Sequence, residues 1–176
     1  ALERKAREHE QAEEWNDASD TYERILELDS NLAFAQDGLN RTRQMEALHE
    51  TLQGYIAEPD SLSRPSTMQS ATALLLDITR MDDIGPRLAD RRDELSRLLK
   101  RAATPLTVRL VSDNLTDVSI YKVGKLGSFD QHELSLRPGT YVAVGVRPGY
   151  RDVRLEFRVA PEIDMEPIVV RCEEPI

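Results

Sequence analysis

The spacing of the hydrophobic residues changes near residue 104, and this change restricts the chain to two kinds of structure in succession. Up to Arg101, apolar residues recur every three or four positions, as between Ala71 and Ile78, which is the spacing of one helix face. After Thr104, apolar and polar residues alternate, as between Val153 and Val159, which is typical of strands. We therefore predict an α+β chain in two domains, with α-helical hairpins first and an all-β sandwich second.

Prolines and turn-forming residues divide the helical part. Asn16-Asp17 offers a turn and an N-cap between the first two helices, and Pro59 ends the third, because proline cannot continue a helix. Pro65 and Pro86 are placed to open the next two helices. The expected divisions are helices over residues 1–57, a loop over 58–65, a helical pair over 66–101 that packs on the first helices, and the β domain over 104–176.

In the β part, glycines and prolines separate strands that each have one apolar face. Turns are expected at Gly124 to Gly127, at Pro138-Gly139 and at Gly149. Gly139 in particular is expected to adopt a positive φ angle in a type II turn. Two sheets stacked about 10 Å apart would bury the apolar faces. The residues expected to face inward include Val142, Val144, Val146, Val170 and Cys172.

The charge and composition of the chain argue against several classes of function. The net charge is −9, and the excess lies in residues 1–60, which hold 15 acids and 6 bases. Such a chain is poorly suited to bind nucleic acid, which requires an excess of cations. One cysteine cannot form an internal disulfide, and the sequence has no apolar run long enough to cross a bilayer.

No group of residues has the spacing of a catalytic or metal site. His9 and His49 are expected at ordinary surface or edge positions, and Cys172 at a core position of a strand. Residues 124–127 lack the spacing of a phosphate loop, and His132 has no nucleophile or second acid predictably beside it. We therefore expect no enzyme activity, no cofactor and no metal.

The first helices resemble a tetratricopeptide repeat over about residues 2–57. The small, aromatic and aliphatic positions that carry the resemblance are Ala6, Trp15, Ala18, Tyr22, Leu26, Leu28, Ala35 and Leu39. The resemblance implies binding of partner proteins along the face made by the first helix of each pair. Because one repeat cannot bury its own apolar face, the segment is expected to pack on the rest of the chain or to belong to a longer array with sequence upstream.

The expected binding face carries a repeated set of polar residues. Glu3 and Arg7 recur one repeat later as Asp37 and Arg41, and Gln44 follows at the next position of the pattern. The resemblance implies that these residues line a polar groove for an extended or helical peptide. The alternative is a solvated helix surface, because acid–base pairs four residues apart are common on exposed helices.

The β part resembles a PEGA domain, a small β-sandwich of bacterial envelope and surface proteins, over about residues 105–172. The segments that carry the resemblance are Val118 to Gly127, Leu134 to Val144 with its Pro138-Gly139 step, and Arg147 to Asp152. The resemblance implies an extracytoplasmic, non-catalytic module. Such an analogy of fold does not by itself define a function.

Arginines and tyrosines of the β part form a second candidate binding surface. Its members are Tyr121, Tyr150, Arg151, Arg154 and Arg158. Together they would attract an anionic partner such as an acidic glycan, peptidoglycan, a lipid head group or the chain's own acidic first third. The alternative is an ordinary solvated face of the outer sheet.

These expectations define a non-catalytic protein–protein interaction or scaffolding module of a larger bacterial cell-envelope protein. The expected location is periplasmic or otherwise extracytoplasmic, with membrane contact only through an inner-membrane anchor in upstream sequence. Two alternatives stay open: a glycan- or peptidoglycan-binding module that works through the β part, and an extracytoplasmic sensory domain. The glycan alternative requires exposed aromatic platforms, and the chain has one Trp, five Tyr and three Phe.

Overall fold

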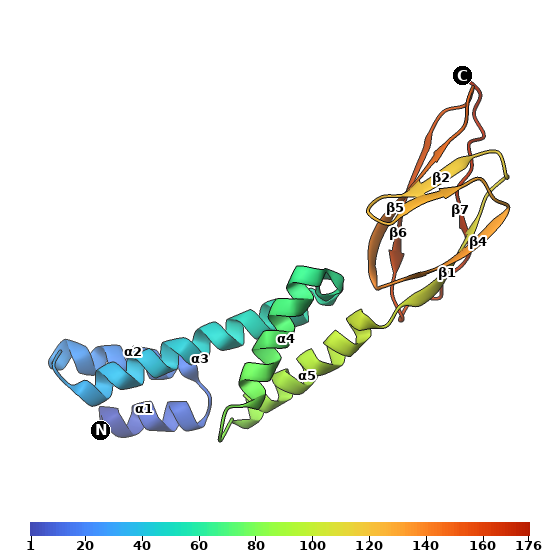
Figure 1. Cartoon of the computed structure of the whole chain (residues 1–176). Helices are drawn as coiled ribbons and strands as arrows, with labels where there is room; N and C mark the ends of the chain where they lie inside the picture. The colour runs from blue at the N-terminus through green and yellow to red at the C-terminus, as the bar shows by residue number, and fades with distance from the viewer. The chain divides into compact units, whose positions relative to one another are not determined.

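The computed structural model describes residues 1–176, which form two compact units (Figure 1). The first unit contains residues 1–58 and 70–97 and is helical. The second contains residues 59–69 and 98–176 and holds all of the strands. The chain is therefore α+β in two parts, as the change in hydrophobic spacing predicts. The second unit also includes residues 59–69, which the sequence divisions assign to a loop and the start of the helical pair.

The helices follow the apolar spacing closely. They are α1 (Leu2–Gln11), α2 (Trp15–Leu28), α3 (Ala33–Ala57), the 3₁₀ helix η1 (Pro59–Ser63), α4 (Pro65–Thr79) and α5 (Pro86–Ala103). As predicted, α4 and α5 each begin with a proline, whose fixed φ angle suits the first helical position. None of these helices combines the length and the apolar character that crossing a membrane requires.

The first three helices enclose a small apolar core. Ala6, Tyr22, Ile25 and Ala35 are each at most 5% exposed. The ring of Tyr22 lies against the backbone of Gly38, where a Cβ atom would overlap the ring. Glycine at this position therefore allows α2 to approach α3 closely.

The turn between α1 and α2 lies at residues 12–14, so the predicted turn at Asn16-Asp17 is wrong. Within the turn, Glu13 has a left-handed conformation with a φ angle of 54°. Its carboxylate accepts hydrogen bonds from the backbone amides of Arg87 (2.7 Å) and Leu88 (3.0 Å) in the first turn of α5. These amides have no partner within their own helix, and Glu13 satisfies them from a distant part of the sequence.

Seven strands form two sheets that share an apolar core. The strands are β1 (Leu106–Val111), β2 (Asp117–Ile120), β3 (Gly124–Gly127), β4 (Gln131–Leu136), β5 (Gly139–Val146), β6 (Val153–Val159) and β7 (Ile168–Val169). One sheet has the order β4-β1-β7 and the other the order β3-β2-β5-β6. Neighbours are antiparallel except β1 and β7, which are parallel. Leu110, Val118, Ile120, Ala143 and Val170 are buried in this core.

In β5, the residues that face the core are the ones expected from the sequence to face outward. Ala143 and Gly145 face the core, because they lie opposite the buried Ile120 and Val118 of β2. Little space is left there: a Cβ atom at Gly145 would lie 2.7 Å from the side chain of Thr116. Small residues are therefore required at these positions. The prediction of an inward face is wrong for Val142, Val144 and Val146.

From Val169 at the end of β7 to Cys172, exposed and buried residues alternate as predicted. Val170 and Cys172 are buried, and Val169 and Arg171 between and beside them are exposed. The Cys172 thiol donates a hydrogen bond to the carbonyl oxygen of Gly145 (3.3 Å). The interpretation of Cys172 as a small core residue is confirmed.

The glycine-containing turns differ from one another in their geometry. Residues 124–127 form strand β3, and the chain reverses at residues 121–123 instead. At Gly149 the φ angle is 81°, and an amide–carbonyl hydrogen bond of 3.1 Å closes the turn over residues 147–150, as expected. Gly139 has a positive φ angle, 156°, but it begins β5 and does not have the angle of a type II turn.

An ion-pair cluster connects Asp60, within residues 59–69, to other residues of the second unit. Arg101 of α5 donates hydrogen bonds to Asp60 (3.0 Å) and to Glu162 (2.6 and 2.9 Å). Arg158 of β6 donates to the other carboxylate oxygen of Asp60 (2.9 Å). The hydrogen bond between Glu162 and Arg101 raises the pKa of Arg101 and lowers that of the exposed Glu162 to about 2.

Candidate functional site

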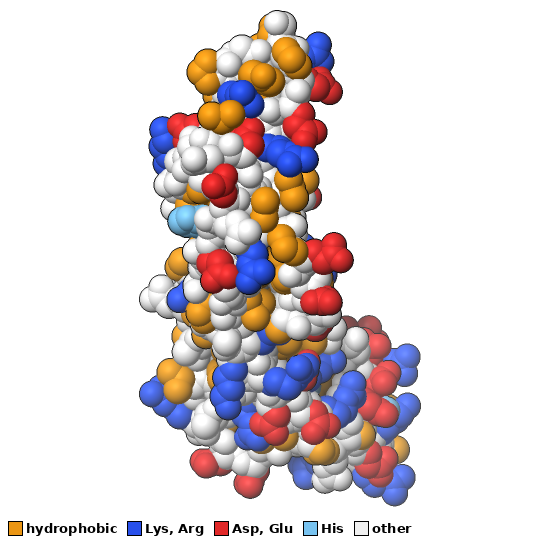
Figure 2. Space-filling model, turned by 90° about the vertical axis from the view of Figure 1, so that its right-hand side faces the viewer, with side chains coloured by type: hydrophobic (Ala, Val, Ile, Leu, Met, Phe, Trp, Pro, Cys, Tyr) orange, Lys and Arg blue, Asp and Glu red, His pale blue; other side chains and the backbone are white.

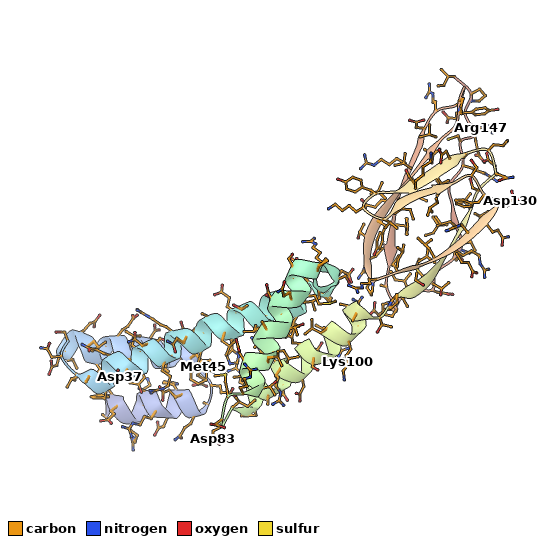
Figure 3. All side chains as sticks on the ribbon, viewed as in Figure 1. Asp37, Met45, Asp83, Lys100, Asp130 and Arg147 are labelled. Atoms are coloured by element: carbon orange, nitrogen blue, oxygen red, sulfur yellow. The ribbon has the colours of Figure 1, made fainter.

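A groove of about 880 Å³ runs along the C-terminal half of α3 in the helical unit. It begins just after Met45, which Figure 3 labels on α3. The other walls come from the α1–α2 turn, the first turn of α2 and the first turns of α5. We call this hollow the acidic groove. It is lined by Glu13, Glu14, Trp15, Asn16, Asp17, Glu46, His49, Glu50, Gln53, Gly54, Ala57, Arg87 and Arg91.

One face of α3 forms the floor of the acidic groove. Its lining residues recur every three or four positions, so they lie on one side of the helix. At 1.5 Å per residue, the stripe from Glu46 to Ala57 is about 16 Å long. That length matches about five residues of an extended chain, at roughly 3.3 Å per residue. The stripe consists of Glu46, His49, Glu50, Gln53, Gly54 and Ala57.

Two aromatic side chains of the groove have buried polar atoms without a partner. These atoms are Nε1 of Trp15 and Nε2 of His49, and the two ring centroids are 6.2 Å apart. The His49 residue is only 8% exposed. A buried donor or acceptor without a hydrogen bond costs about 1–3 kcal/mol. Two such unpaired atoms therefore occur in residues that line one groove.

The surroundings of His49 favour its neutral form. Burial lowers the pKa of His49, Arg91 and Arg87 lower it further, and the carboxylate of Glu13 acts in the opposite direction. Nη1 of Arg91 donates a hydrogen bond to the His49 carbonyl oxygen, and Nη1 of Arg87 donates to that of Glu13, both at 2.9 Å. Both arginines are thus held in place by backbone contacts at the groove wall.

The acidic groove has more carboxylates than the protein itself pairs. Glu14 binds Nδ1 of His9 at 2.6 Å, and the carboxylate of Glu13 accepts hydrogen bonds from two backbone amides of α5. The side chains of Asp17, Glu46 and Glu50 take part in no hydrogen bond or ion pair. These three carboxylates are therefore free to receive cationic groups from outside.

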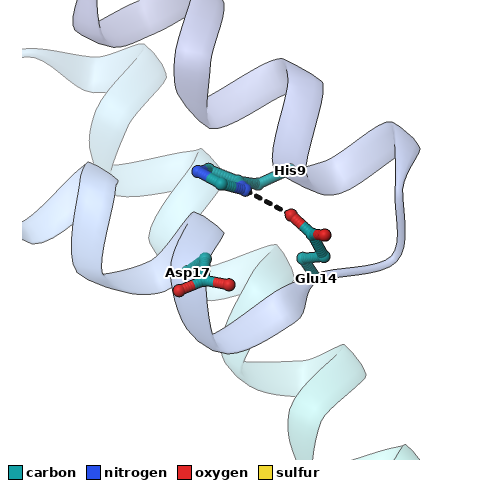
Figure 4. Close-up of side chains that lie close together, drawn as sticks. All are labelled: His9, Glu14 and Asp17. Atoms are coloured by element: carbon teal, nitrogen blue, oxygen red, sulfur yellow. Dashed lines mark hydrogen bonds and ion pairs between the residues drawn. The ribbon is translucent and has the colours of Figure 1, made fainter.

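His9, Glu14 and Asp17 also form the cluster that comes nearest to a metal site (Figure 4). One ligand atom from each residue lies within 4.8 Å of the others. An imidazole and two carboxylates suit a divalent transition metal. However, Glu14 and Asp17 are exposed, and the contact between His9 and Glu14 is complete as an ion pair. The geometry of the cluster therefore requires no cation.

The predicted polar face on the first helices is a separate hollow of about 450 Å³. Arg7 of α1 and Asp37 and Arg41 of α3 all line it, and Figure 3 shows Asp37 near the start of α3. Glu3 and Gln44, which the pattern also assigns to this face, are not among its lining residues. The structure thus brings three of the five predicted residues together.

Ion pairs within the protein occupy most charges of this smaller hollow. Glu3 binds Arg7 at 2.6 Å, which is the helix-surface pairing that the alternative interpretation predicts. Arg41 does not pair with its own helix but donates to Glu10 of α1 at 2.6 Å. Tyr22 also donates to Glu10 (3.3 Å), and burial together with Glu10 raises the pKa of Tyr22. The hollow therefore leaves few unpaired groups for a partner.

The two tyrosines predicted as a binding surface of the β unit lie far apart. Tyr121 is 69% exposed and its amide donates a hydrogen bond to the carbonyl oxygen of Val142 in the middle of β5. Tyr150 follows the other end of β5 and has the guanidinium of Arg147 stacked on its ring at 3.9 Å. These two tyrosines therefore cannot form one stacking platform.

The three arginines of the predicted surface have different environments. Arg151 pairs with Glu174 at 3.6 Å, and Arg158 pairs with Asp60 at 2.9 Å. Arg154 is exposed and has no ion pair. On the face shown in Figure 2, basic and acidic side chains are intermixed. The β unit thus shows no concentrated cationic patch among these residues.

The sequence interpretation missed the acidic groove. The spacing of Glu46, His49 and Glu50 on α3 was the available signal, but His49 was expected at an ordinary surface or edge position, which is wrong. Trp15, expected from the sequence only as a position of the tetratricopeptide pattern, begins α2 and has its ring beside that of His49. The partner of the His49 backbone, Arg91, lies 42 residues away, so no local spacing reveals it.

Comparisons with known proteins do not extend this description. No protein-family model matches the chain, and a search of curated proteins found no matching sequence.

Proposed function

We propose that the chain is a non-catalytic protein–protein interaction module and that the acidic groove is its binding site. The observation that carries this proposal is the pair of buried, unpartnered atoms Trp15 Nε1 and His49 Nε2 in the residues of a groove of about 880 Å³. A polypeptide has a regular series of backbone donors and acceptors, so a bound segment would supply partners for both atoms once the side chains that cover them move aside. The dimensions of the groove also suit a segment of about five residues.

The character of the groove supports binding rather than catalysis. No serine, threonine or cysteine lines it, so the usual hydroxyl and thiol nucleophiles are missing there. Arg87 and Arg91 bind backbone carbonyl groups, and Glu13 binds backbone amides. These charged side chains therefore stabilise the fold through contacts with the backbone.

The proposal extends to the two resemblances and the location that they imply. We propose that α1, α2 and the start of α3 form a tetratricopeptide-like unit, which the close packing of Tyr22 on Gly38 supports. We propose a PEGA-like sandwich for the β unit, supported by its sheets of three and four strands. A scaffolding role in the bacterial cell envelope, in a periplasmic or other extracytoplasmic location, follows from that resemblance. Glycan binding has less support, because Tyr121 lies beside the middle of β5, whereas Tyr150 follows its end and is covered by Arg147.

Site-specific crosslinking in cells that produce the protein tests the proposed site. Gln53 is an exposed residue of the groove and can be replaced by a photoreactive amino acid such as p-benzoylphenylalanine. Irradiation is expected to give one defined adduct of higher mass that contains a second polypeptide.

The control places the same photoreactive amino acid at Glu27, an exposed residue of α2 that does not line the groove. The control is expected to give no such adduct. Identical adducts from both positions would show that contact with the groove is not selective. Failure of the Gln53 variant to capture any polypeptide would count against the proposed function.

A further inference from the structure

We infer that the acidic groove accepts an extended segment of a partner protein in which two Lys or Arg residues are separated by one residue. The inference rests on the proposed function and adds the chemistry and spacing of the partner. It is carried by the unpaired carboxylates, the geometry of α3 and the open space over Gly54.

The charge of the groove selects a cationic partner. Five carboxylates and two guanidinium groups line it, which gives a formal charge of −3 with His49 neutral. Asp17, Glu46 and Glu50 have no partner within the protein. Charge complementarity across an interface favours partners of the opposite sign and rejects those of the same sign. An acidic segment would meet repulsion from all three carboxylates.

The spacing of two of these carboxylates defines the spacing of the partner's cations. Glu46 and Glu50 are four residues apart on α3, so their Cβ atoms are about 5–6 Å apart along one face. Alternate residues of an extended strand lie on the same side and are roughly 6.6 Å apart. Two basic residues with one residue between them therefore meet both carboxylates. Adjacent basic residues would point to opposite sides.

Gly54 provides the space for the main chain of the segment. It is exposed, and a Cβ atom at this position would meet nothing within 4 Å. Glycine within a helix is about 0.5–1 kcal/mol less favourable than alanine, and no contact inside the protein requires it here. Its position on the floor of the groove allows a ligand backbone to approach α3 closely. Trp15 and His49 lie nearer the other end of the stripe, and their covered Nε1 and Nε2 atoms, once exposed by the bound segment, would bind main-chain groups there.

Synthetic pentapeptides with blocked termini test the charge and the spacing together. The three probes are Ala-Lys-Ala-Lys-Ala, Ala-Lys-Lys-Ala-Ala and Ala-Glu-Ala-Glu-Ala. Trp15 is the only tryptophan of the chain, so its fluorescence reports on the groove directly. Titration of the full chain is expected to show binding of the first peptide at least about tenfold tighter than the second, and no binding of the third.

Three variants of groove residues and one control test whether the binding occurs in the acidic groove. Glu46→Gln and Glu50→Gln are each expected to weaken binding of the alternating lysine peptide about fivefold to tenfold, and added salt is expected to reduce the difference. Glu27→Gln removes an exposed carboxylate outside the groove and is expected to leave the affinity unchanged. Gly54→Leu introduces a good helix former but fills the open space, and it is expected to abolish binding.

Two outcomes would overturn the inference. Equal affinity for the lysine and glutamate peptides would show that the groove does not select cations; if Gly54→Leu still blocked both peptides, the proposed peptide site would stand. Absence of any fluorescence response to all three peptides would also overturn the inference. The crosslinking experiment at Gln53 would then still test the proposed function, because it does not depend on the sequence of the partner. Circular dichroism of each variant confirms that a loss of binding is not a loss of folding.

Discussion

At the scale of the residue, two glycines of α3 have opposite surroundings. Gly38 lies under the ring of Tyr22, and any added side chain there would overlap the ring. Gly54 faces open space at the floor of the acidic groove. The first glycine is explained by packing inside the protein, whereas no contact inside the protein explains the second.

Alanine substitution at these two positions is expected to change stability in opposite directions. Gly38→Ala forces Tyr22 away from α3 and is expected to lower the free energy of unfolding by about 1–3 kcal/mol. Gly54→Ala meets no neighbour and improves helix propensity, so it is expected to raise that free energy by up to about 1 kcal/mol. Urea unfolding followed by circular dichroism measures both. A destabilising effect of Gly54→Ala would contradict the open environment of this residue.

The buried His49 is expected to make the stability of the helical unit depend on pH. Its pKa in the folded chain lies below the ordinary value of 6.5, because of burial and then the nearby Arg91 and Arg87. The unfolded chain therefore takes up a proton at a higher pH than the folded chain does. The stability associated with neutral His49 is complete above about pH 6.5 and is lost as the pH falls below that value.

Unfolding free energies measured between about pH 8 and pH 5 test this dependence. Trp15 fluorescence follows the helical unit, since the chain has no other tryptophan. The substitution His49→Gln is expected to flatten the loss of stability below about pH 6.5. An equal slope in the natural chain and the variant would assign the pH dependence to other groups.

At the scale of the element, the start of α5 depends on a residue from the α1–α2 turn. Glu13 is only 4% exposed, and its carboxylate accepts hydrogen bonds from two backbone amides of α5. A negative charge at this position also interacts favourably with the dipole of the helix. Gly85 before α5 leaves room for the carboxylate, since a Cβ atom there would overlap it. The contact fixes one wall of the acidic groove relative to another.

Glu13→Gln is expected to lower the free energy of unfolding by about 1–2 kcal/mol, because the neutral amide is a weaker acceptor and introduces a donor beside two amide donors. The matched control is Glu27→Gln, an exposed change on α2 that is expected to stay within about 0.5 kcal/mol of the natural chain. Both values come from urea unfolding. Equal effects of the two substitutions would contradict the capping role of Glu13.

At the scale of the whole molecule, the succession of helices and strands was predictable because each part has a strong apolar period of its own. The long helix α3 and the alternation in β6 follow directly from that period. The inward face of β5 was not predictable in the same way. Both of its faces carry small or apolar residues, so the phase depends on Thr116 and Ile120, which lie opposite it in the folded sheet.

The candidate site was less predictable than the fold. The acidic groove depends on contacts between residues that are far apart in the sequence, such as Glu13 with Leu88 and Arg91 with His49. Local spacing can show which residues share a face of α3, but not that α5 and the start of α2 leave a hollow beside that face. The polar set on α1 and α3 was found because it repeats, yet its charges are largely paired within the protein.

The central claim is that the acidic groove binds a polypeptide segment, and the indole N–H of Trp15 tests it most directly. One tryptophan gives one indole signal in a ¹H–¹⁵N correlation spectrum of the full chain. Because Nε1 of Trp15 has no hydrogen-bond partner in the free protein, binding of Ala-Lys-Ala-Lys-Ala is expected to move this signal downfield in a saturable manner. An indole signal that stays in place at every concentration of all three pentapeptides would contradict the claim.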